Sequence, residues 1–353
     1  MRVHVDGIVF SLQAHGGISV LFRELLSRLA GAPDVSTMLS LEEPVRQDAV
    51  LIQNGELRAL ARPARIGERF RTCRPTSNPG GHGAAQVFHS TYYRRPAGAS
   101  VPTVVTVHDF AYERCVGGWR TTLHRAQKNA AIRAAQAIIC VSSATREDLL
   151  SLVGLRRGQS VHVVHNGVDE IFRPLSCRHP PAAVPFILFV GQRGRYKNFA
   201  LAASALAFLP ELELHCVGGA ALAAAELAHL GPKVRARVRH LGAVSDEQLN
   251  LLYNTAVCLM YPSAYEGFGI PIVEAQRAGC PVIGLDTAAV REVSGNAMVV
   301  AEARAEALAQ ALRETQRANV RSKLVLAGHA NASRYSWARN YLETLAVYRA
   351  LAN

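Results

Sequence analysis

The feature that most constrains the fold is the alternation of short apolar runs with helical patterns along the whole chain. The run RVHVDG is followed by ISVLFRELLSRLAG, in which apolar residues recur at helical spacing and Gly31 ends the pattern. The further strand-like runs are TVVTVHD, AIICVSS, VHVVHNG, FILFVG and LELHCVGG, with helical patterns between them. This order is typical of parallel sheets covered by helices, so the sequence predicts an α/β fold.

A proline-rich break at residues 173–185, RPLSCRHPPAAVP, interrupts the alternation, which then restarts. We interpret it as a linker between two Rossmann-like domains that face each other across a cleft. The predicted domains cover residues 1–173 and 184–334. The amphipathic end of the chain predicts a last helix within residues 335–353.

The net charge of the 353-residue chain is +12, which suits an anionic ligand, an acidic membrane surface or nucleic acid. Residues 1–178 hold 22 Lys and Arg against 14 Asp and Glu, a net +8, and six arginines fall between Arg58 and Arg74. Leu, Ile and Phe are interleaved with these arginines, which favours an anionic membrane leaflet, and a solvated surface is the alternative. No nucleic-acid-binding motif accompanies the charge, so we expect no nucleic acid partner.

Two further features indicate the compartment. No apolar run approaches the roughly 18 residues needed to cross a bilayer, and the N-terminus lacks the apolar core of a signal peptide. The seven cysteines are scattered without a C-x-x-C pair, which is typical of reduced thiols and argues against a disulfide framework or zinc site. We therefore expect a cytoplasmic protein.

The stretch AYEGFGIPIVEAQRAGCPVIG places Glu266 and Glu274 eight positions apart. An apolar strand pattern precedes it, Pro271 suits the first turn of a helix, and Gly279 suits the helix end. The sequence therefore predicts Glu266 in a glycine-rich loop and Glu274 on the following helix, both facing one crevice.

Residues suited to bind an anion follow other predicted strands. Glycines before a helix let an anion approach the helix N-terminus, and basic groups neutralise it. These candidates are His108, Gly16, Gly17, Arg193, Arg195 and Lys197. Each is weak evidence by itself, because a glycine pair is usually a turn and a basic loop is usually solvated.

The combination resembles the retaining nucleotide-sugar glycosyltransferases of family 4, which have the two-Rossmann GT-B fold. Glu266 and Glu274 resemble the family's E-x7-E motif, and GGIS, VTVHDF and VHNGVD resemble its N-terminal glycine loop, its His-containing loop and its crossing into the second domain. HLGAVSDEQLNLLYNTA is similar to the segment beside the nucleobase, and SWARNYLETLAVYR to a closing helix that returns to the first domain.

The resemblance implies a role for each matching position. Glu274 would bind the ribose hydroxyls, Glu266 would hold the donor sugar and stabilise positive charge at its anomeric carbon, and His108 would contact that sugar. Lys197 and an arginine would neutralise the leaving diphosphate, with Arg193 the first choice and Arg195 the second, because the family's usual arginine position holds Gln192. The other implied donor-binding residues are Gly16, Gly17, Gly267, Phe268, Gly269 and Val244.

The implied reaction is a transfer with retention of anomeric configuration, in which the departing phosphate takes the acceptor's proton. The sequence has no D-x-D motif, so we expect metal-independent transfer without a cofactor. Domain closure over the donor would exclude water and suppress hydrolysis.

The stretches FHSTYYRRP, VVTVHDFAYE and GQRGRYKN resemble bacterial O-antigen and capsule mannosyltransferases. The resemblance favours GDP-mannose as donor, a lipid-linked saccharide as acceptor, and a peripheral position at the inner face of the cytoplasmic membrane. A UDP-sugar donor and a non-catalytic nucleotide-sugar-binding scaffold are the alternatives. The E-x7-E pattern argues against a nucleotide-sugar epimerase, and the lack of G-x-G-x-x-G spacing argues against a dehydrogenase.

Overall fold

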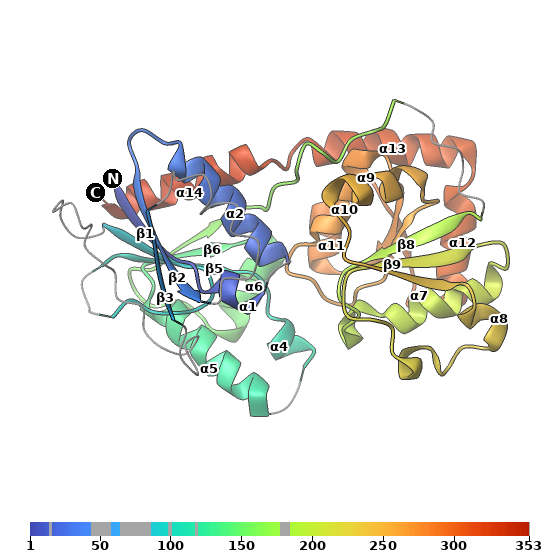
Figure 1. The fold of residues 1–353 in the computed structure, drawn as a ribbon, viewed down its shortest axis with the longest axis horizontal. Helices are drawn as coiled ribbons and strands as arrows, with labels where there is room; N and C mark the ends of the chain where they lie inside the picture. The colour runs from blue at the N-terminus through green and yellow to red at the C-terminus, as the bar shows by residue number, and fades with distance from the viewer. Residues whose placement is uncertain are drawn as a thin grey trace. The chain divides into compact units, whose positions relative to one another are not determined.

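The computed structural model describes residues 1–13, 16–43, 58–63, 86–97, 101–116, 119–176 and 184–352. The chain divides into two compact units, one formed by Met1–Gly167 with Trp337–Asn353 and the other by Val168–Ser336. Each unit is an α/β layer structure with one parallel sheet (Figure 1). The predicted fold class is confirmed for both units.

The first unit contains a seven-stranded sheet in the order β3-β2-β1-β4-β5-β6-β7, in which all neighbouring strands are parallel. Its strands are β1 Arg2–Asp6, β2 Ser36–Glu43, β3 Arg58–Pro63, β4 Val87–Ser90, β5 Thr103–Val107, β6 Ala137–Cys140 and β7 Ser160–Val163. Its helices are α1 Val9–Leu12, α2 Gly17–Ala30, α4 Ala111–Arg114, α5 Trp119–Ala134, α6 Ser143–Leu152 and α14 Trp337–Ala352.

The second unit contains a six-stranded parallel sheet in the order β10-β9-β8-β11-β12-β13. Its strands are β8 Phe186–Val190, β9 Glu213–Val217, β10 Val238–Gly242, β11 Leu259–Tyr261, β12 Val282–Leu285 and β13 Val299–Ala301. Its α-helices are α7 Phe199–Ala205, α8 Pro232–Arg235, α9 Asp246–Thr255, α10 Ile270–Ala278, α11 Ala288–Ser294, α12 Ala305–Thr315 and α13 Ala318–Ala332. Single turns of 3-10 helix lie at Arg195–Lys197, Leu206–Phe208 and Ala224–Leu227.

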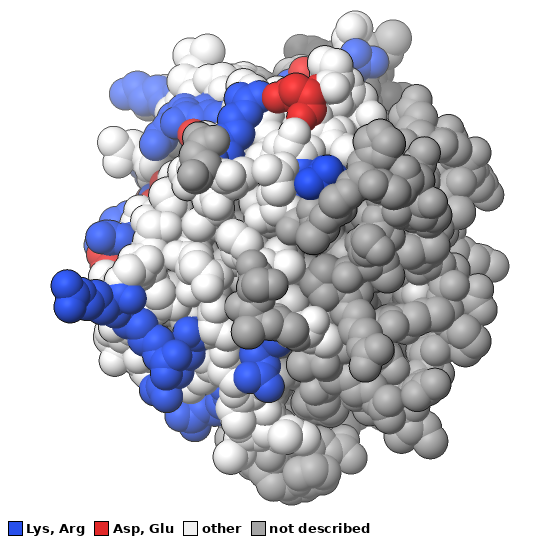
Figure 2. Space-filling view, turned by 90° about the vertical axis from the view of Figure 1, so that its left-hand side faces the viewer, with Lys and Arg blue, Asp and Glu red and all other residues white. Residues whose placement is uncertain are grey.

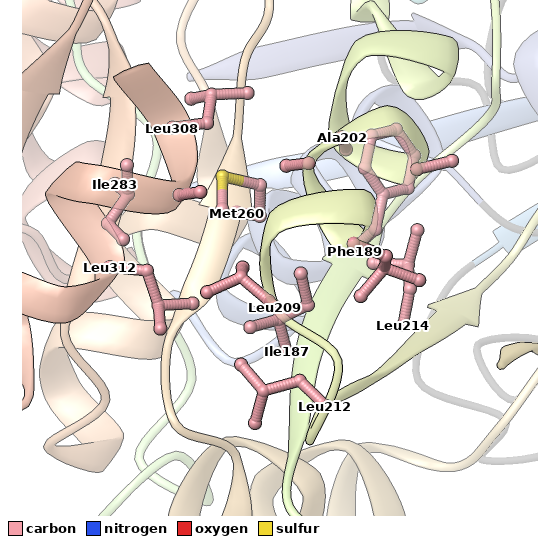
Figure 3. Packing of buried hydrophobic residues seen from close by; sticks show 14 of the residues in the cluster. Ile187, Phe189, Ala202, Leu209, Leu212, Leu214, Met260, Ile283, Leu308 and Leu312 are labelled. Atoms are coloured by element: carbon pink, nitrogen blue, oxygen red, sulfur yellow. The ribbon is translucent and has the colours of Figure 1, made fainter. Parts of the chain in front are cut away.

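The core of the second unit shows why the apolar runs form this sheet. Alternate residues of β8, such as Ile187 and Phe189, point to the face covered by α7 and α12, where they belong to one buried cluster with Ala202, Leu308 and Leu312 (Figure 3). Leu188 points to the opposite face and is also fully buried. Strands buried on both faces read as continuous apolar runs, which is the pattern seen in the sequence.

The closing helix α14 belongs to the first unit, as the resemblance implies. It packs beside α2 (Figure 1). The Tyr348 hydroxyl lies 2.5 Å from His89 Nδ1 in the core of this unit. Arg349 also pairs with Asp34 at 2.6 Å near the surface.

The boundary between the units lies a few residues before the predicted position 173. Residues 168–173 fall in the second unit because they are fixed to α9. The backbone N–H of Arg173 donates to the Asn250 side chain at 3.0 Å, and Phe172 packs edge-on against Tyr253 at 5.9 Å. These contacts join residues about 80 positions apart, so the proline-rich composition alone could not reveal them.

Within the described part of the chain, no helix combines the length and apolarity needed to cross a membrane. The five cysteines that the structure describes all carry free thiols, four of them buried and Cys115 exposed.

Candidate functional site

The second unit presents a candidate site where β8 and β11 lie side by side. These strands are neighbours in the sheet but not in the sequence, and ligands of open parallel sheets bind at the carboxyl ends of such strand pairs. The segment after β8 and the loop after β11 are joined there by two hydrogen bonds. The backbone N–H of Ala264 donates to the carbonyl of Tyr196 at 2.8 Å, and the amide of Asn198 donates to the carbonyl of Pro262 at 2.9 Å.

Lys197 and Glu266 meet at this edge of the sheet. The Lys197 ammonium donates to Glu266 Oε1 at 2.5 Å and lies 3.4 Å from the hydroxyl oxygen of Tyr261. The two charged side chains are only 16% and 9% exposed, so water screens their charges weakly. A partly buried ammonium beside a carboxylate can neutralise an anion while the carboxylate stabilises positive charge next to it.

Glu274 lies on α10, as predicted, and is half-buried. Burial raises the pKa of Glu274 from 4.5 to about 7, the hydrogen bond from Tyr253 opposes this shift, and the carboxylates of Asp246 and Asp169 add to it. The Tyr253 hydroxyl donates to Glu274 Oε2 at 2.9 Å. Glu274 is therefore poised to lose its proton when a ligand brings additional hydrogen-bond donors.

The glycine loop between the two glutamates orients α10. Gly269 caps the start of the helix with a φ of +104°, and a Cβ there would lie 3.1 Å from Ile272, so a larger residue would be strained. Pro271 occupies the first turn and Gly279 ends the helix in the left-handed conformation, both as the sequence predicts. Phe268 is buried and packs edge-on against Tyr335 with ring centres 5.5 Å apart, and this contact anchors the loop in the interior of the second unit.

The two candidate arginines of the loop after β8 differ in their surroundings. Arg193 is almost fully buried and pairs with Glu226 at 2.8 Å, and it also donates to the carbonyls of Gly218 and Ala220. Arg195 is exposed, and its side chain has no hydrogen bond or ion pair with the described residues. Arg193, the first choice from the sequence, is therefore occupied by its contacts with the segment after β9. Arg195, the second choice, has no such contacts with the described residues and is available to bind an anion.

In the first unit, His108 follows β5 directly and lies in the interior. Burial, together with the nearby charge of Lys128, lowers the pKa of His108 to about 3, so the imidazole is neutral at physiological pH. The His108 Nε2 atom is buried and has no hydrogen-bond partner among the described residues. The ring packs edge-on against Phe22 of α2 at 6.1 Å.

The loop that carries His108 is fixed by a buried lysine. The Lys128 ammonium donates to the carbonyl of Asp109 at 3.1 Å and to Glu113 at 2.7 Å, and it lies 4.1 Å from the centre of the Phe110 ring. The Lys128 side chain is 1% exposed and that of Glu113 is 4% exposed. The Lys128 ammonium thus contacts Asp109 and Phe110 of the loop and Glu113 of α4. These contacts hold the His108 loop in place.

The remaining predicted positions lie on loops and helix ends. Gly16 precedes α2, Gly17 begins it, and the first amides of this 14-residue helix have no acceptor within the helix. Val244 lies half-buried between β10 and α9. The arginine-rich stretch from Arg58 is described only as the backbone of β3 up to Pro63, and its remainder to Arg74 lies outside the described residues.

Four residues that contact the predicted site residues or the loop that carries His108 were not found from the sequence. They are Tyr253, Tyr261, Glu226 and Lys128. The two tyrosines continue the apolar pattern of a helix and a strand, and the charges of Glu226 and Lys128 are typical of surface residues. Residue spacing therefore gives no signal for any of the four. Within the described residues, no group of three or more His, Cys, Asp or Glu side chains has the arrangement of a metal site.

Comparison with known proteins supports the fold and indicates an enzyme class. Residues 179–328 match the family Glycosyl transferases group 1, and residues 15–171 match Glycosyltransferase Family 4. The chain is 38% identical over 116 residues to O-antigen chain mannosyltransferase B of Escherichia coli, a match that covers 32% of this chain and 30% of that protein. It is 27% identical over 315 residues to alpha-maltose-1-phosphate synthase of Mycolicibacterium smegmatis, covering 75% of this chain and 79% of the synthase.

Two solved structures share the fold over nearly the full length. Sucrose-phosphate synthase from Thermosynechococcus elongatus superposes with a TM-score of 0.80 at 19% identity, covering 99% of both chains. Anabaena Alr3699/HepE in complex with UDP-glucose superposes with a TM-score of 0.73 at 17% identity, covering 98% of this chain and 100% of that one. The two parallel sheets, the family matches and these likenesses together identify the chain as a GT-B glycosyltransferase built from a family 4 domain and a group 1 domain.

Proposed function

We propose that the chain is a retaining hexosyltransferase that moves mannose from GDP-mannose to a lipid-linked or saccharide acceptor in the synthesis of a cell-surface polysaccharide. The observation that carries this proposal is the partly buried pair between Lys197, in the turn after β8, and Glu266, on the loop that leads to Glu274. It supplies one cation for a diphosphate and one carboxylate for a developing positive charge, on a single rigid edge of the sheet.

The proposed mechanism uses these side chains in fixed positions. Lys197 and Arg195 bind the diphosphate and neutralise the charge that grows on it as the glycosidic bond breaks. Glu266 faces the sugar and stabilises the positive charge of the anomeric carbon. The departing phosphate oxygen accepts the proton of the acceptor hydroxyl on the same face, which retains the anomeric configuration.

The proposal includes transfer without a divalent metal, because fixed basic side chains perform the neutralisation that a metal would otherwise provide. The Lys197 ammonium is held by Glu266 and lies near Tyr261, so its position is set before the donor arrives. His108 and the Gly16–Gly17 start of α2 belong to the first unit, and their contacts with the donor remain predictions of the family resemblance.

GDP-mannose is favoured by the 38% identity to an O-antigen mannosyltransferase, although that match covers only 30% of the relative. A UDP-sugar is the second candidate, because a structure with the same fold was solved with UDP-glucose. The lipid-linked acceptor and peripheral binding to an anionic membrane are parts of the same proposal.

A thermal-shift screen of GDP, UDP, ADP and their sugar conjugates in EDTA tests the donor assignment. A ligand that binds the native state raises the melting temperature by mass action. We expect the largest shift with GDP and GDP-mannose. A shift with UDP compounds alone would overturn the mannosyl assignment, and the absence of any shift would favour a non-catalytic scaffold.

The raised pKa of Glu274 predicts how nucleotide affinity depends on pH. Ribose hydroxyls donate hydrogen bonds to a carboxylate, so binding favours the ionised form and lowers this pKa of about 7. Affinity should therefore rise as pH increases from about 5.5 to 8, with up to about one proton released per nucleotide bound on the acid side of the pKa. Calorimetric titrations in two buffers of different ionisation enthalpy measure this proton.

Glu274→Gln is the matched variant, because the neutral amide cannot release the proton. Its affinity should be lower at pH 8 and nearly independent of pH. An affinity of the native protein that stays flat or falls with rising pH would show that Glu274 does not bind the nucleotide as a carboxylate.

The different surroundings of Arg193 and Arg195 predict different consequences of their loss. Arg193→Met leaves Glu226 and the carbonyls of Gly218 and Ala220 without their donor, so we expect about 1–2 kcal/mol lower stability. Arg195→Met should leave stability within about 0.5 kcal/mol, because the side chain is exposed, and should weaken binding of the diphosphate. Denaturant unfolding and nucleotide titration of both variants separate these effects, and the reverse outcome would restore Arg193 as the diphosphate ligand.

A further inference from the structure

The first unit carries a hollow of about 470 Å³ between α5 and two arginines from other segments. Arg95 enters it from the segment after β4, Arg156 from the segment after α6, and Arg133 from α5 itself. Helix α5 contributes small side chains to the lining of the hollow, at Ala126 and Ala130, and these leave room for a ligand. These two lie four positions apart, on one face of the helix.

The charge of the hollow is entirely positive. None of the three arginines forms an ion pair with a carboxylate of the described residues, and the described residues that line the hollow include no acidic one. Arg156 Nη1 donates to the main-chain carbonyl of Arg133 at 3.3 Å, which fixes one guanidinium at the rim. Figure 2 shows a face of the first unit on which the described charged groups are mostly basic.

Three guanidinium groups converging on one hollow match a phosphate group. The planar fork of arginine donates two parallel hydrogen bonds to phosphate oxygens, and it stays charged at every physiological pH. A bound dianion or diester would also relieve the repulsion among the three like charges.

A second observation concerns a neutral group in the same hollow. Asn129 lines the hollow, and its side-chain oxygen is buried without a hydrogen-bond partner among the described residues. A buried acceptor without a donor is costly, so a ligand that brings a hydroxyl beside its phosphate would satisfy it. Glycerol phosphates have both groups within a few bonds of each other.

Three exposed leucines lie close in the sequence to residues that line the hollow. Leu155 directly precedes Arg156 and is 44% exposed, Leu152 ends α6 and is 40% exposed, and Leu123 lies one helical turn before Ala126 and is 49% exposed. Apolar side chains beside basic groups suit the boundary between lipid headgroups and acyl chains.

We propose that this hollow binds a phosphate group that carries a neighbouring hydroxyl, as in the headgroup of phosphatidylglycerol. Arg95, Arg133 and Arg156 bind the phosphate oxygens, and Asn129 accepts a hydrogen bond from the hydroxyl. The site uses residues other than the Lys197–Glu266 pair. The inference rests on the membrane binding that the proposed function includes, and its test does not measure the transfer reaction.

The test uses the full-length chain in two binding experiments. The first is co-sedimentation with vesicles of phosphatidylcholine that contain phosphatidylglycerol, compared with phosphatidylcholine alone. The second is a calorimetric titration with free glycerol 1-phosphate. Binding to mixed vesicles alone assigns the phosphate to a lipid, and binding of free glycerol 1-phosphate at the same site assigns it to a soluble phosphate ester.

Two kinds of variant show whether the hollow itself binds. Ala126→Phe fills it at an exposed helix position without changing the charge, and Arg133→Gln removes one guanidinium. Arg157→Gln is the matched control, because Arg157 is exposed and adjacent to Arg156 but does not line the hollow. Loss of one basic residue near an anionic surface by itself costs about fivefold in partition.

We expect Ala126→Phe and Arg133→Gln to weaken binding by about tenfold or more, and Arg157→Gln by no more than about fivefold. Unchanged melting temperatures of the variants confirm that they are folded. The proposal is overturned if neither probe binds the native protein. It is also overturned if Ala126→Phe binds as the native protein does while Arg133→Gln and Arg157→Gln lose affinity equally, since that result indicates general surface charge.

Discussion

Replacing Lys197 by methionine should lower kcat by about 10²–10³-fold, the loss seen when a fixed donor to a developing negative charge is removed. The methionine keeps the apolar length of the side chain but removes the ammonium that Glu266 holds at 2.5 Å. The diphosphate then leaves without its fixed counter-charge. Release of GDP from GDP-mannose, measured with and without an acceptor extract, gives the rate.

Two further variants make this result specific. Lys197→Arg retains a charge with a different shape and should recover part of the rate, because the two cations are not interchangeable at a fixed site. Lys233→Met removes an exposed lysine of α8 in the same unit and should have no effect on kcat. An unchanged rate in Lys197→Met would contradict the role of this lysine in the departure of the diphosphate.

Replacing Glu266 by glutamine should lower kcat by about 10²-fold or more while the dissociation constant for GDP changes little. The amide keeps the shape of the side chain, and its oxygen can still accept a hydrogen bond from Lys197. It lacks the negative charge that stabilises the anomeric carbon, and that charge matters only as the glycosidic bond breaks. An effect confined to the transition state lowers kcat and kcat/KM together.

Glu314→Gln, at an exposed position of α12, is the matched control and should leave both constants unchanged. Glu274→Gln provides the contrast, because its main expected loss is in nucleotide affinity at neutral and higher pH. If Glu266→Gln weakens GDP binding as strongly as it lowers kcat, then Glu266 contacts the nucleotide and not the sugar.

The strands, loops and helices that short sequence patterns specify could be predicted from the sequence. The strand β11, the loop of Glu266 and the helix α10 of Glu274 follow from an apolar run, two glycines and a proline at the helix start, and the structure has all of them. The apolar runs of β5, β6 and β8 were equally clear, because strands buried on both faces have continuous apolar sequences.

The contacts that tune the site were not predictable, because they join distant positions. Lys197 and Glu266 are 69 positions apart, and Arg193 and Glu226 are 33 apart. The sequence favoured Arg193 over Arg195 by its place in the loop alone, and the choice between them depends on which guanidinium the segment after β9 engages. The burial of Lys128 beneath the His108 loop likewise depends on the packing of α5 against α4.

The central claim is that the chain transfers a sugar from a nucleotide diphosphate with retention and without a divalent metal. The most direct test follows GDP-α-mannose by proton NMR in EDTA, with methanol as a simple acceptor, because a methyl glycoside cannot interconvert between anomers. We predict GDP and methyl α-mannoside as products, and a loss of both in Lys197→Met. Methyl β-mannoside, or turnover that begins only when a divalent metal is added, would contradict the account.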